Sequence, residues 1–352
     1  MLIFILACDE SLDSGQPTEF DPLESATSPG SWNVGHGQVS VDYLDPLGAE
    51  RSLRTSVWWP TPDTSGFAAT YFYGSDESEV AFENATVAEG TFPVVVFSHG
   101  HQAFAECSSF LMEHLASHGF VVIAPDHTNN TTLDGADRAT EIYIQRPFDL
   151  SAVIDALEAG SLPVPANRYD GRLVVTGHSF GGYTVIASGG SQYDTDAITA
   201  ECTSPSSGIC ESWSADWVPM FQAGAYDDRV QGVLAMAAGD FDLFGAAGVV
   251  EVKVPTLLMT GELDPQHAAD GADYWAALSP VGHRYVSIAE AGHNAFTDFS
   301  GVFEDGGTID PAQGFRIVDA YALAFAASAT GDGRYEAILD GRIEVDTLAT
   351  VH

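Results

Sequence analysis

The stretch Gly177-His178-Ser179-Phe180-Gly181 matches the pattern G-x-S-x-G, in which a serine lies on a sharp turn between a strand and a helix. Residues 172–176 form a short apolar, β-branched run that is typical of a buried parallel strand. Residues 182–188 can form the helix that follows. The two glycines remove Cβ atoms where strand and helix crowd together. The sequence therefore predicts a nucleophilic serine at the carboxyl edge of a sheet, at the N-terminus of a helix whose dipole favours negative charge.

A serine nucleophile needs a base, and the base needs a group that orients it. Two predicted strands, 254–260 and 284–288, are followed by Asp264 and His293. Open α/β sheets place their chemistry at this edge, and the order serine, acid, histidine is the one that accompanies G-x-S-x-G. We expect His293 to relay the serine proton and Asp264 to orient the imidazole. Two other acids compete for the second role, Glu262 and Asp240.

Acyl transfer also needs donors for the oxyanion. One is expected from the backbone amide of Phe180, directly after the nucleophile. The other is expected from the loop 98–102, which follows the predicted strand 93–97. Glycine at position 100 lets this backbone bend towards a substrate, so the amide of His101 is the predicted donor. The His101 side chain either shapes the pocket or only lines the surface.

The remaining pattern predicts a single α/β domain over residues 31–345. Strands alternate with helical stretches, which favours a mostly parallel sheet flanked by helices. The predicted strands are 94–98, 120–124, 172–176, 230–236, 254–260 and 284–288. Asp149 is expected to cap a helix over Leu150–Glu158. Residues Phe315, Val318, Ala322 and Phe325 recur at helical spacing and are expected to pack in the core.

Four motifs carry a resemblance to a known family: Val95–Gly100, Leu115–Val122, Gly177–Gly182 and Gly292–Phe299. They resemble bacterial α/β-hydrolases of the platelet-activating-factor acetylhydrolase and cutinase-like (polyesterase–lipase–cutinase) group. The resemblance extends from about residue 32 to residue 339 and so covers most of the chain. It implies an α/β-hydrolase fold, and hydrolysis of carboxylic esters through an acyl-enzyme, without a cofactor or metal.

The two branches of this group differ in the position of the acid. The acetylhydrolase branch carries it after the strand matching 229–236, where this chain has Met236 or a neighbouring alanine. The cutinase branch carries it in the segment matching 261–264, which favours Asp264. Polyester hydrolases also have a tryptophan where this chain has Gly239. We therefore expect short-to-medium acyl esters. The alternatives are a polyester hydrolase, a phospholipase A2-type acetylhydrolase and a non-catalytic binding protein.

Residues about 190–228 form a long, loop-rich insertion between the nucleophile helix and the next strand. Long irregular segments inside compact domains are usually functional or mobile. A lid or a wall of the acyl pocket is one interpretation, and a surface decoration is the other. The candidate substrate-binding residues are Phe104, Trp213, Trp217 and Phe296.

The chain carries 50 acidic and 12 basic residues, a formal net charge of −38. Such a charge argues against nucleic acid or anionic membranes as partners. The expected partner is a small-molecule or polymeric ester, and the expected state is a monomer.

The apolar residues 1–8 resemble the end of a lipoprotein signal, with Cys8 as the lipidated residue, although a basic n-region is missing. Residues 9–30 are expected to be a flexible tether. Cys202 and Cys210 bracket a short loop that a disulfide could close in an oxidising compartment. These features predict an exported protein, extracellular or periplasmic, whose only membrane contact is a lipid anchor.

Overall fold

The computed structural model describes residues 20–135, 138–205, 208–278 and 282–352. The signal-like segment 1–8, the proposed lipidation site Cys8 and residues 9–19 of the predicted tether lie outside this part of the chain. Across the described segments, no helix has both the length and the apolar character required to cross a bilayer.

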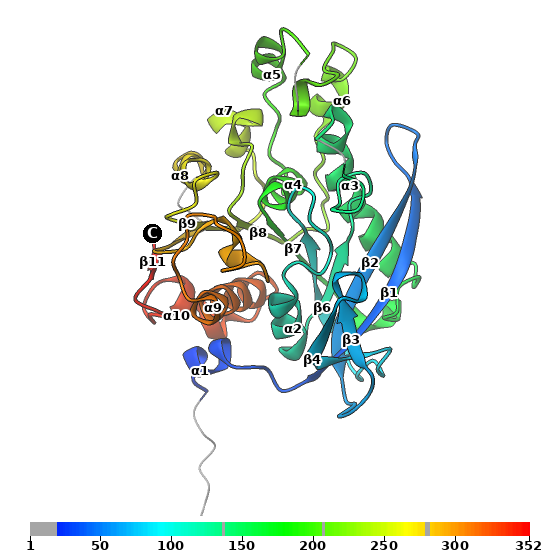
Figure 1. Cartoon of the computed structure of the whole chain (residues 1–352), viewed down its shortest axis with the longest axis vertical. Helices are drawn as coiled ribbons and strands as arrows, with labels where there is room; N and C mark the ends of the chain where they lie inside the picture. Colours follow the sequence, from blue (N-terminus) through cyan, green and yellow to red (C-terminus); the bar gives the residue numbers. More distant parts are fainter. Residues whose placement is uncertain (1–19, 136–137, 206–207, 279–281) are drawn as a thin grey trace, which may run out of the picture.

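The described residues form one eleven-stranded sheet in the order β11-β10-β9-β8-β7-β5-β6-β2-β1-β4-β3 (Figure 1). Strands β5 to β10 are parallel to their neighbours, whereas β2 and β11 pair in antiparallel fashion with β6 and β10. The strands are β1 Asn33–Leu44, β2 Glu50–Thr61, β3 Ala68–Tyr71, β4 Asp76–Glu83, β5 Phe92–Ser98, β6 Val121–Pro125, β7 Tyr169–His178, β8 Gly232–Met236, β9 Thr256–Gly261, β10 Arg284–Ile288 and β11 Ala349–Val351.

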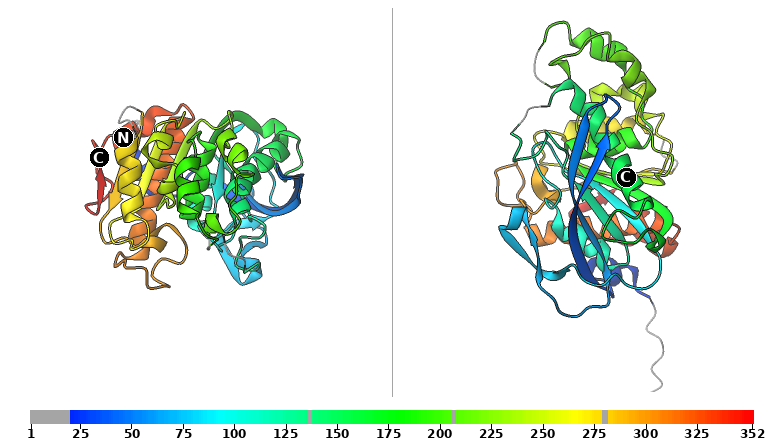
Figure 2. Two further views of the ribbon diagram at one scale, coloured as in Figure 1. Left: turned by 90° about the horizontal axis from the view of Figure 1, so that it is seen from above. Right: turned by 90° about the vertical axis from the view of Figure 1, so that its right-hand side faces the viewer.

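Helices cover both faces of this sheet. The α-helices are α1 Pro22–Thr27, α2 Ser109–Ser117, α3 Thr140–Glu158, α4 Phe180–Ser188, α5 Thr195–Glu201, α6 Val218–Ala223, α7 Gly245–Val249, α8 Ala268–Ala277, α9 Pro311–Ala329 and α10 Glu336–Leu339. The 3-10 helices are η1 Phe72–Gly74, η2 Ala166–Arg168, η3 Gly208–Cys210, η4 Phe241–Leu243, η5 His293–Phe296 and η6 Gly333–Tyr335. Figure 2 shows the long β1–β2 hairpin along one side and the insertion with α5 and α6 at one end.

Two hydrophobic clusters explain the layers. Strands β5 to β8 are buried on both faces, because their Val, Ile and Leu side chains alternate between the clusters. One cluster joins the sheet to α2 and α9, and the other joins it to α3, α4, α7 and α8. The predicted fold class, a mostly parallel sheet flanked by helices, is confirmed.

The prediction that Asp149 caps a helix is wrong. The helix α3 starts at Thr140, nine residues earlier than position 149, and continues through Pro147. Asp149 lies in its interior with its carboxylate fully buried. A sequence pattern cannot distinguish a capping aspartate from one that binds distant cations, here Arg51 at 2.7 Å.

The predicted limits of the α/β domain, residues 31 and 345, also need correction at both ends. Residues 22–27, expected to belong to the tether, form the helix α1 with Asp21 as its N-cap. This helix packs against α9, and the hydroxyl of Ser25 lies 2.9 Å from that of Tyr335. The sheet also extends beyond residue 345, because β11 pairs with β10.

Candidate active site

Ser179 lies on the turn between β7 and α4 with φ 57° and ψ −120°, a strained conformation for a residue with a side chain. The neighbouring glycines make this turn possible. A Cβ on Gly177 would lie 2.3 Å from the carbonyl oxygen of Gly181, and one on Gly181 would lie 1.9 Å from that of Ser98. The predicted sharp turn between strand and helix is therefore present, and any larger residue at either position would force the backbone apart.

His293 and Asp264 follow β10 and β9 and meet at the carboxyl edge of the sheet. The Nδ1 atom of His293 lies 2.8 Å from Oδ2 of Asp264, and both residues are buried. Burial opposes ionisation of Asp264, but the hydrogen bonds from His293 and from the amides of Gln266 and His267 outweigh it and lower the pKa of this carboxyl. Asp264 is thus an ionised acceptor that holds the Nδ1 proton and leaves Nε2 of His293 as the basic nitrogen.

The two rival acids are engaged elsewhere. Asp240 binds Arg138 at 2.8 Å, and burial raises the pKa of its carboxyl. Glu262 accepts a hydrogen bond from the hydroxyl of Ser287 at 3.0 Å. Of the three acids considered from the sequence, Asp264 is the one hydrogen-bonded to His293.

The loop after β5 lies directly against the serine. A Cβ on Gly100 would lie 3.4 Å from the Cβ of Ser179, so the backbone approaches the turn as closely as van der Waals contact allows. Phe180 is the first residue of α4, and its amide has no acceptor within the helix. The ring of His101 lies edge-on to that of Phe180, with centroids 6.3 Å apart. The two segments expected to supply oxyanion donors are therefore adjacent.

Two residues near His293 were not expected from the sequence. His178 donates from Nε2 to the carbonyl oxygen of His293 at 2.8 Å, and burial lowers the pKa of His178 to about 3, which keeps its imidazole neutral. The ring of His267 lies 5.1 Å from that of His293 and fills the space beside Gly239, where an added Cβ would lie 2.3 Å from it. No local signal could reveal either contact, because both depend on the packing of separate loops.

The four candidate substrate-binding residues occupy three different places. Phe104 is buried in an aromatic cluster with Phe72 and Phe299. Phe296 is the last residue of η5, the 3-10 helix that begins at His293; it is fully buried, and its ring lies 6.0 Å from that of His178. Trp213 and Trp217 are half-buried in the insertion.

The rings of Trp213 and Trp217 both pack on Phe221, at 5.0 and 6.3 Å. Their indole nitrogens donate to Thr199 and Ser212, which also belong to the insertion. These contacts brace the insertion itself, and the role of the two tryptophans in substrate binding stays a prediction. Within the insertion, a disulfide joins Cys202 to Cys210.

Comparisons with known proteins agree with this fold. A family model described as Chlorophyllase matches residues 82–198. Cutinase 2 of Thermobifida cellulosilytica is 32% identical over 54% of this chain and 63% of its own length. A bis(hydroxyethyl) terephthalate hydrolase of Streptomyces coelicolor is 31% identical over 49% of this chain and 50% of its own. A platelet-activating factor acetylhydrolase of Canis lupus familiaris is 35% identical over 32% of this chain and 29% of its own.

A solved structure of a ferulic acid esterase from Streptomyces cinnamoneus superposes with a TM-score of 0.67, at 20% identity, over 92% of this chain and 98% of the other. This similarity shows the fold. The sequence matches span from 28% to 63% of the lengths of the curated relatives. They confirm the resemblance noted from the motifs: the fold is that of an α/β-hydrolase, and part of the chain is similar in sequence to cutinases and to an acetylhydrolase.

Proposed function

We propose that the protein is a serine-dependent carboxylic ester hydrolase that works through an acyl-enzyme. The observation that carries this proposal is the hydrogen bond between His293 and Asp264 at the same sheet edge as the strained Ser179. The names of the relatives, which include cutinases and a terephthalate ester hydrolase, support the same reaction class.

In the proposed reaction, the hydroxyl oxygen of Ser179 attacks the ester carbonyl carbon while Nε2 of His293 accepts the hydroxyl proton. Asp264 holds the imidazole in the required tautomer and offsets its positive charge. The amides of His101 and Phe180 stabilise the oxyanion of the tetrahedral intermediate. The protonated histidine then donates its proton to the leaving alcohol, and a water molecule releases the acid by the same steps in reverse.

The substrates we propose are soluble esters with short-to-medium acyl chains. Gly239 offers no aromatic wall, and the ring of His267 fills the space beside it. A tryptophan at position 239 could not be accommodated there without moving His267. Two other substrate classes are favoured by specific relatives: polyesters by the cutinases and the terephthalate hydrolase, and short-chain phospholipids by the acetylhydrolase.

Export is a further part of this proposal. The disulfide between Cys202 and Cys210 supports an oxidising compartment, because such bonds are rare in the cytosol. Lipid anchoring at Cys8 and a monomeric state remain predictions.

The decisive experiment is a panel of p-nitrophenyl esters from acetate to palmitate, run beside a phospholipid with a short acyl chain and a polyester film. We expect the highest kcat/KM for the short-to-medium acyl chains of this panel. The Ser179→Ala variant should lose about 10⁶-fold in turnover while keeping its melting temperature. Rapid depolymerisation of the film would overturn the substrate ranking. An inactive wild type, or an active Ser179→Ala variant, would overturn the proposed reaction.

A further inference from the structure

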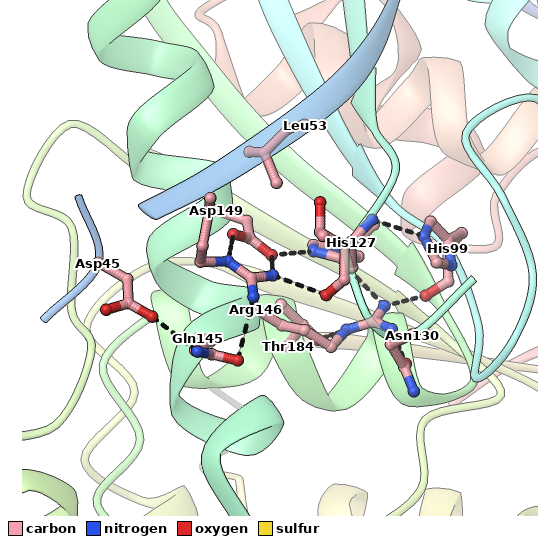
Figure 3. A network of polar contacts seen from close by, with 12 residues as sticks. Asp45, Leu53, His99, His127, Asn130, Gln145, Arg146, Asp149 and Thr184 are labelled. Carbon is pink, nitrogen blue, oxygen red and sulfur yellow. Dashed lines mark hydrogen bonds and ion pairs between the residues drawn. The ribbon is translucent and has the colours of Figure 1, made fainter. Parts of the chain in front are cut away.

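Arg146 on α3 is a fully buried arginine close to the proposed site. Figure 3 draws the polar network around it. Its guanidinium donates to Asn130 Oδ1 at 2.7 Å, to Thr184 Oγ1 at 3.1 Å and to Ser98 Oγ at 3.1 Å. It also donates to the backbone carbonyl of His99. All four acceptors are neutral.

The nearby carboxylate does not neutralise this arginine directly. Asp149 accepts from Nε and Nη2 of Arg51, at 2.7 and 2.8 Å, and from the hydroxyl of Tyr43 at 2.6 Å. In the part of the chain that is described, no carboxylate hydrogen-bonds Arg146. Burial lowers the pKa of Arg146 to about 9, so its guanidinium stays charged at neutral pH. Burying a charge that no carboxylate hydrogen-bonds costs folding free energy. The position of Arg146 therefore points to a role other than stabilising the fold.

Two neutral, buried histidines lie beside the acceptors of Arg146, and one of them orients the hydroxyl of Ser98. Burial lowers the pKa of both His99 and His127 far below the ordinary value, so both rings are neutral. His127 donates from Nδ1 to Asp149 at 2.8 Å, and its Nε2 therefore accepts the proton of the Ser98 hydroxyl at 2.9 Å. This leaves a lone pair of Ser98 for Arg146. These are the residue types of a catalytic triad, but all three side chains are closed to solvent and substrate.

The network of Arg146 reaches both segments that would supply the oxyanion donors. On one side it binds Ser98 and the His99 carbonyl, and Asn130 lies 2.9 Å from Nδ1 of His101. On the other side the guanidinium carbon lies 4.7 Å from the centre of the Phe180 ring. Thr184, which accepts from Arg146, donates in turn to the carbonyl oxygen of Phe180 at 2.8 Å.

We propose that Arg146 is a positioning residue for the oxyanion hole. It holds the loop 98–101 and the start of α4, the two segments that supply the oxyanion donors, at a fixed separation. The inference rests on the proposed ester hydrolysis. Backbone amides stabilise an oxyanion only if their dipoles already point to the place where the charge develops. A single planar cation with several donors can fix two backbone segments at once, whereas an ammonium group binds as a compact point charge.

The test compares Arg146→Gln and Arg146→Lys with the wild type on a soluble p-nitrophenyl ester, with active sites counted by a fluorophosphonate. We expect Arg146→Gln to lose about 10²-fold in kcat, with KM changed less than threefold. Inhibition by an alkyl trifluoromethyl ketone, whose adduct with the serine carries an oxyanion, should weaken by a similar factor. Arg146→Lys keeps the charge but not the geometry, so it should remain at least tenfold impaired. Full activity in either folded variant would overturn the proposal.

Arg51→Gln is the matched control, because it removes a buried arginine from the same network without touching the loop 98–101. It should lower the melting temperature but leave kcat per active site within threefold. An equal loss of kcat in this control would show a general structural effect and overturn the assignment. If Arg146→Gln does not fold, Asn130→Ala removes the side chain that links Arg146 to His101 and should lower kcat about tenfold. Unchanged kcat would again refute the proposal. A wild type inactive on every ester would instead mean that the proposed function has failed.

Discussion

Replacing Asp264 by asparagine tests the proposed triad most sharply, because the surrounding amides determine how the new side chain must lie. Oδ1 of Asp264 accepts from the amides of Gln266 and His267 at 2.8 and 3.1 Å. The asparagine must keep its carbonyl oxygen on that side, since an NH₂ group there would face two donors. Its NH₂ group then points to Nδ1 of His293, which must become an acceptor. The imidazole proton consequently moves to Nε2, the nitrogen that has to accept the proton of Ser179.

The expected loss in kcat is about 10⁴-fold, equivalent to about 5.4 kcal/mol in the activation free energy. The assay is hydrolysis of a soluble p-nitrophenyl ester at neutral pH, together with thermal unfolding to establish that the variant is folded. Asp240→Asn is the matched control, because it removes a second, partly buried carboxylate that binds Arg138 rather than the histidine. Activity of Asp264→Asn within tenfold of the wild type, or a larger loss in Asp240→Asn, would refute the assignment of the acid.

Three further predictions concern the insertion, the disulfide and pH. Replacing residues 195–225 by a short Gly/Ser loop should flatten the acyl-chain profile and change KM more than kcat; an unchanged profile in the folded variant, measured on the ester panel, would show that the insertion is not a lid. Reducing the disulfide, or the pair of changes Cys202→Ser and Cys210→Ser, should lower stability by about 2.5 kcal/mol for a loop of this length, as measured by urea unfolding; equal midpoints would contradict this. Burial raises the pKa of Asp298 to about 7, above the value of about 3.9 in the unfolded chain. The folded state therefore binds the proton more tightly, and this contribution is fully present below about pH 4 and lost as the pH rises through 7. Asp298→Asn should remove at most about 4 kcal/mol of this pH dependence, and an unaltered slope between pH 4 and 7 would argue against it.

The parallel half of the fold could be predicted because its signals are local. Each predicted strand from 94–98 to 284–288 overlaps an observed strand, since a strand buried on both faces needs a continuous apolar run. The antiparallel part gave weaker signals. Strand β1 mixes glycine, histidine and aspartate with its apolar residues, so it lacks a continuous apolar run even though it pairs with β2 over twelve residues of a hairpin.

The site shows the same division. The positions of Ser179, Asp264 and His293 follow from strand ends and their order along the chain, and the structure places Asp264 against His293. The supporting residues could not be found in this way. Arg146 lies in a helix interior, and its four hydrogen-bond partners come from three other segments of the chain. Contacts of this kind have no sequence period, so only the assembled molecule reveals them.

The insertion divides the proposed machinery into two polypeptide halves. Ser179 and the oxyanion loop precede it, whereas Asp264 and His293 follow it. A single proteolytic cut between Cys202 and Cys210 would therefore separate nucleophile from base, yet the disulfide would keep the two fragments covalently joined. The nicked protein would also be held by the parallel pairing of β7 with β8, so reduction of the disulfide alone would leave this second link in place. The chain thus has a position where it could be cut between the nucleophile and the base while its two halves stay joined, once by a covalent bond and once by the sheet.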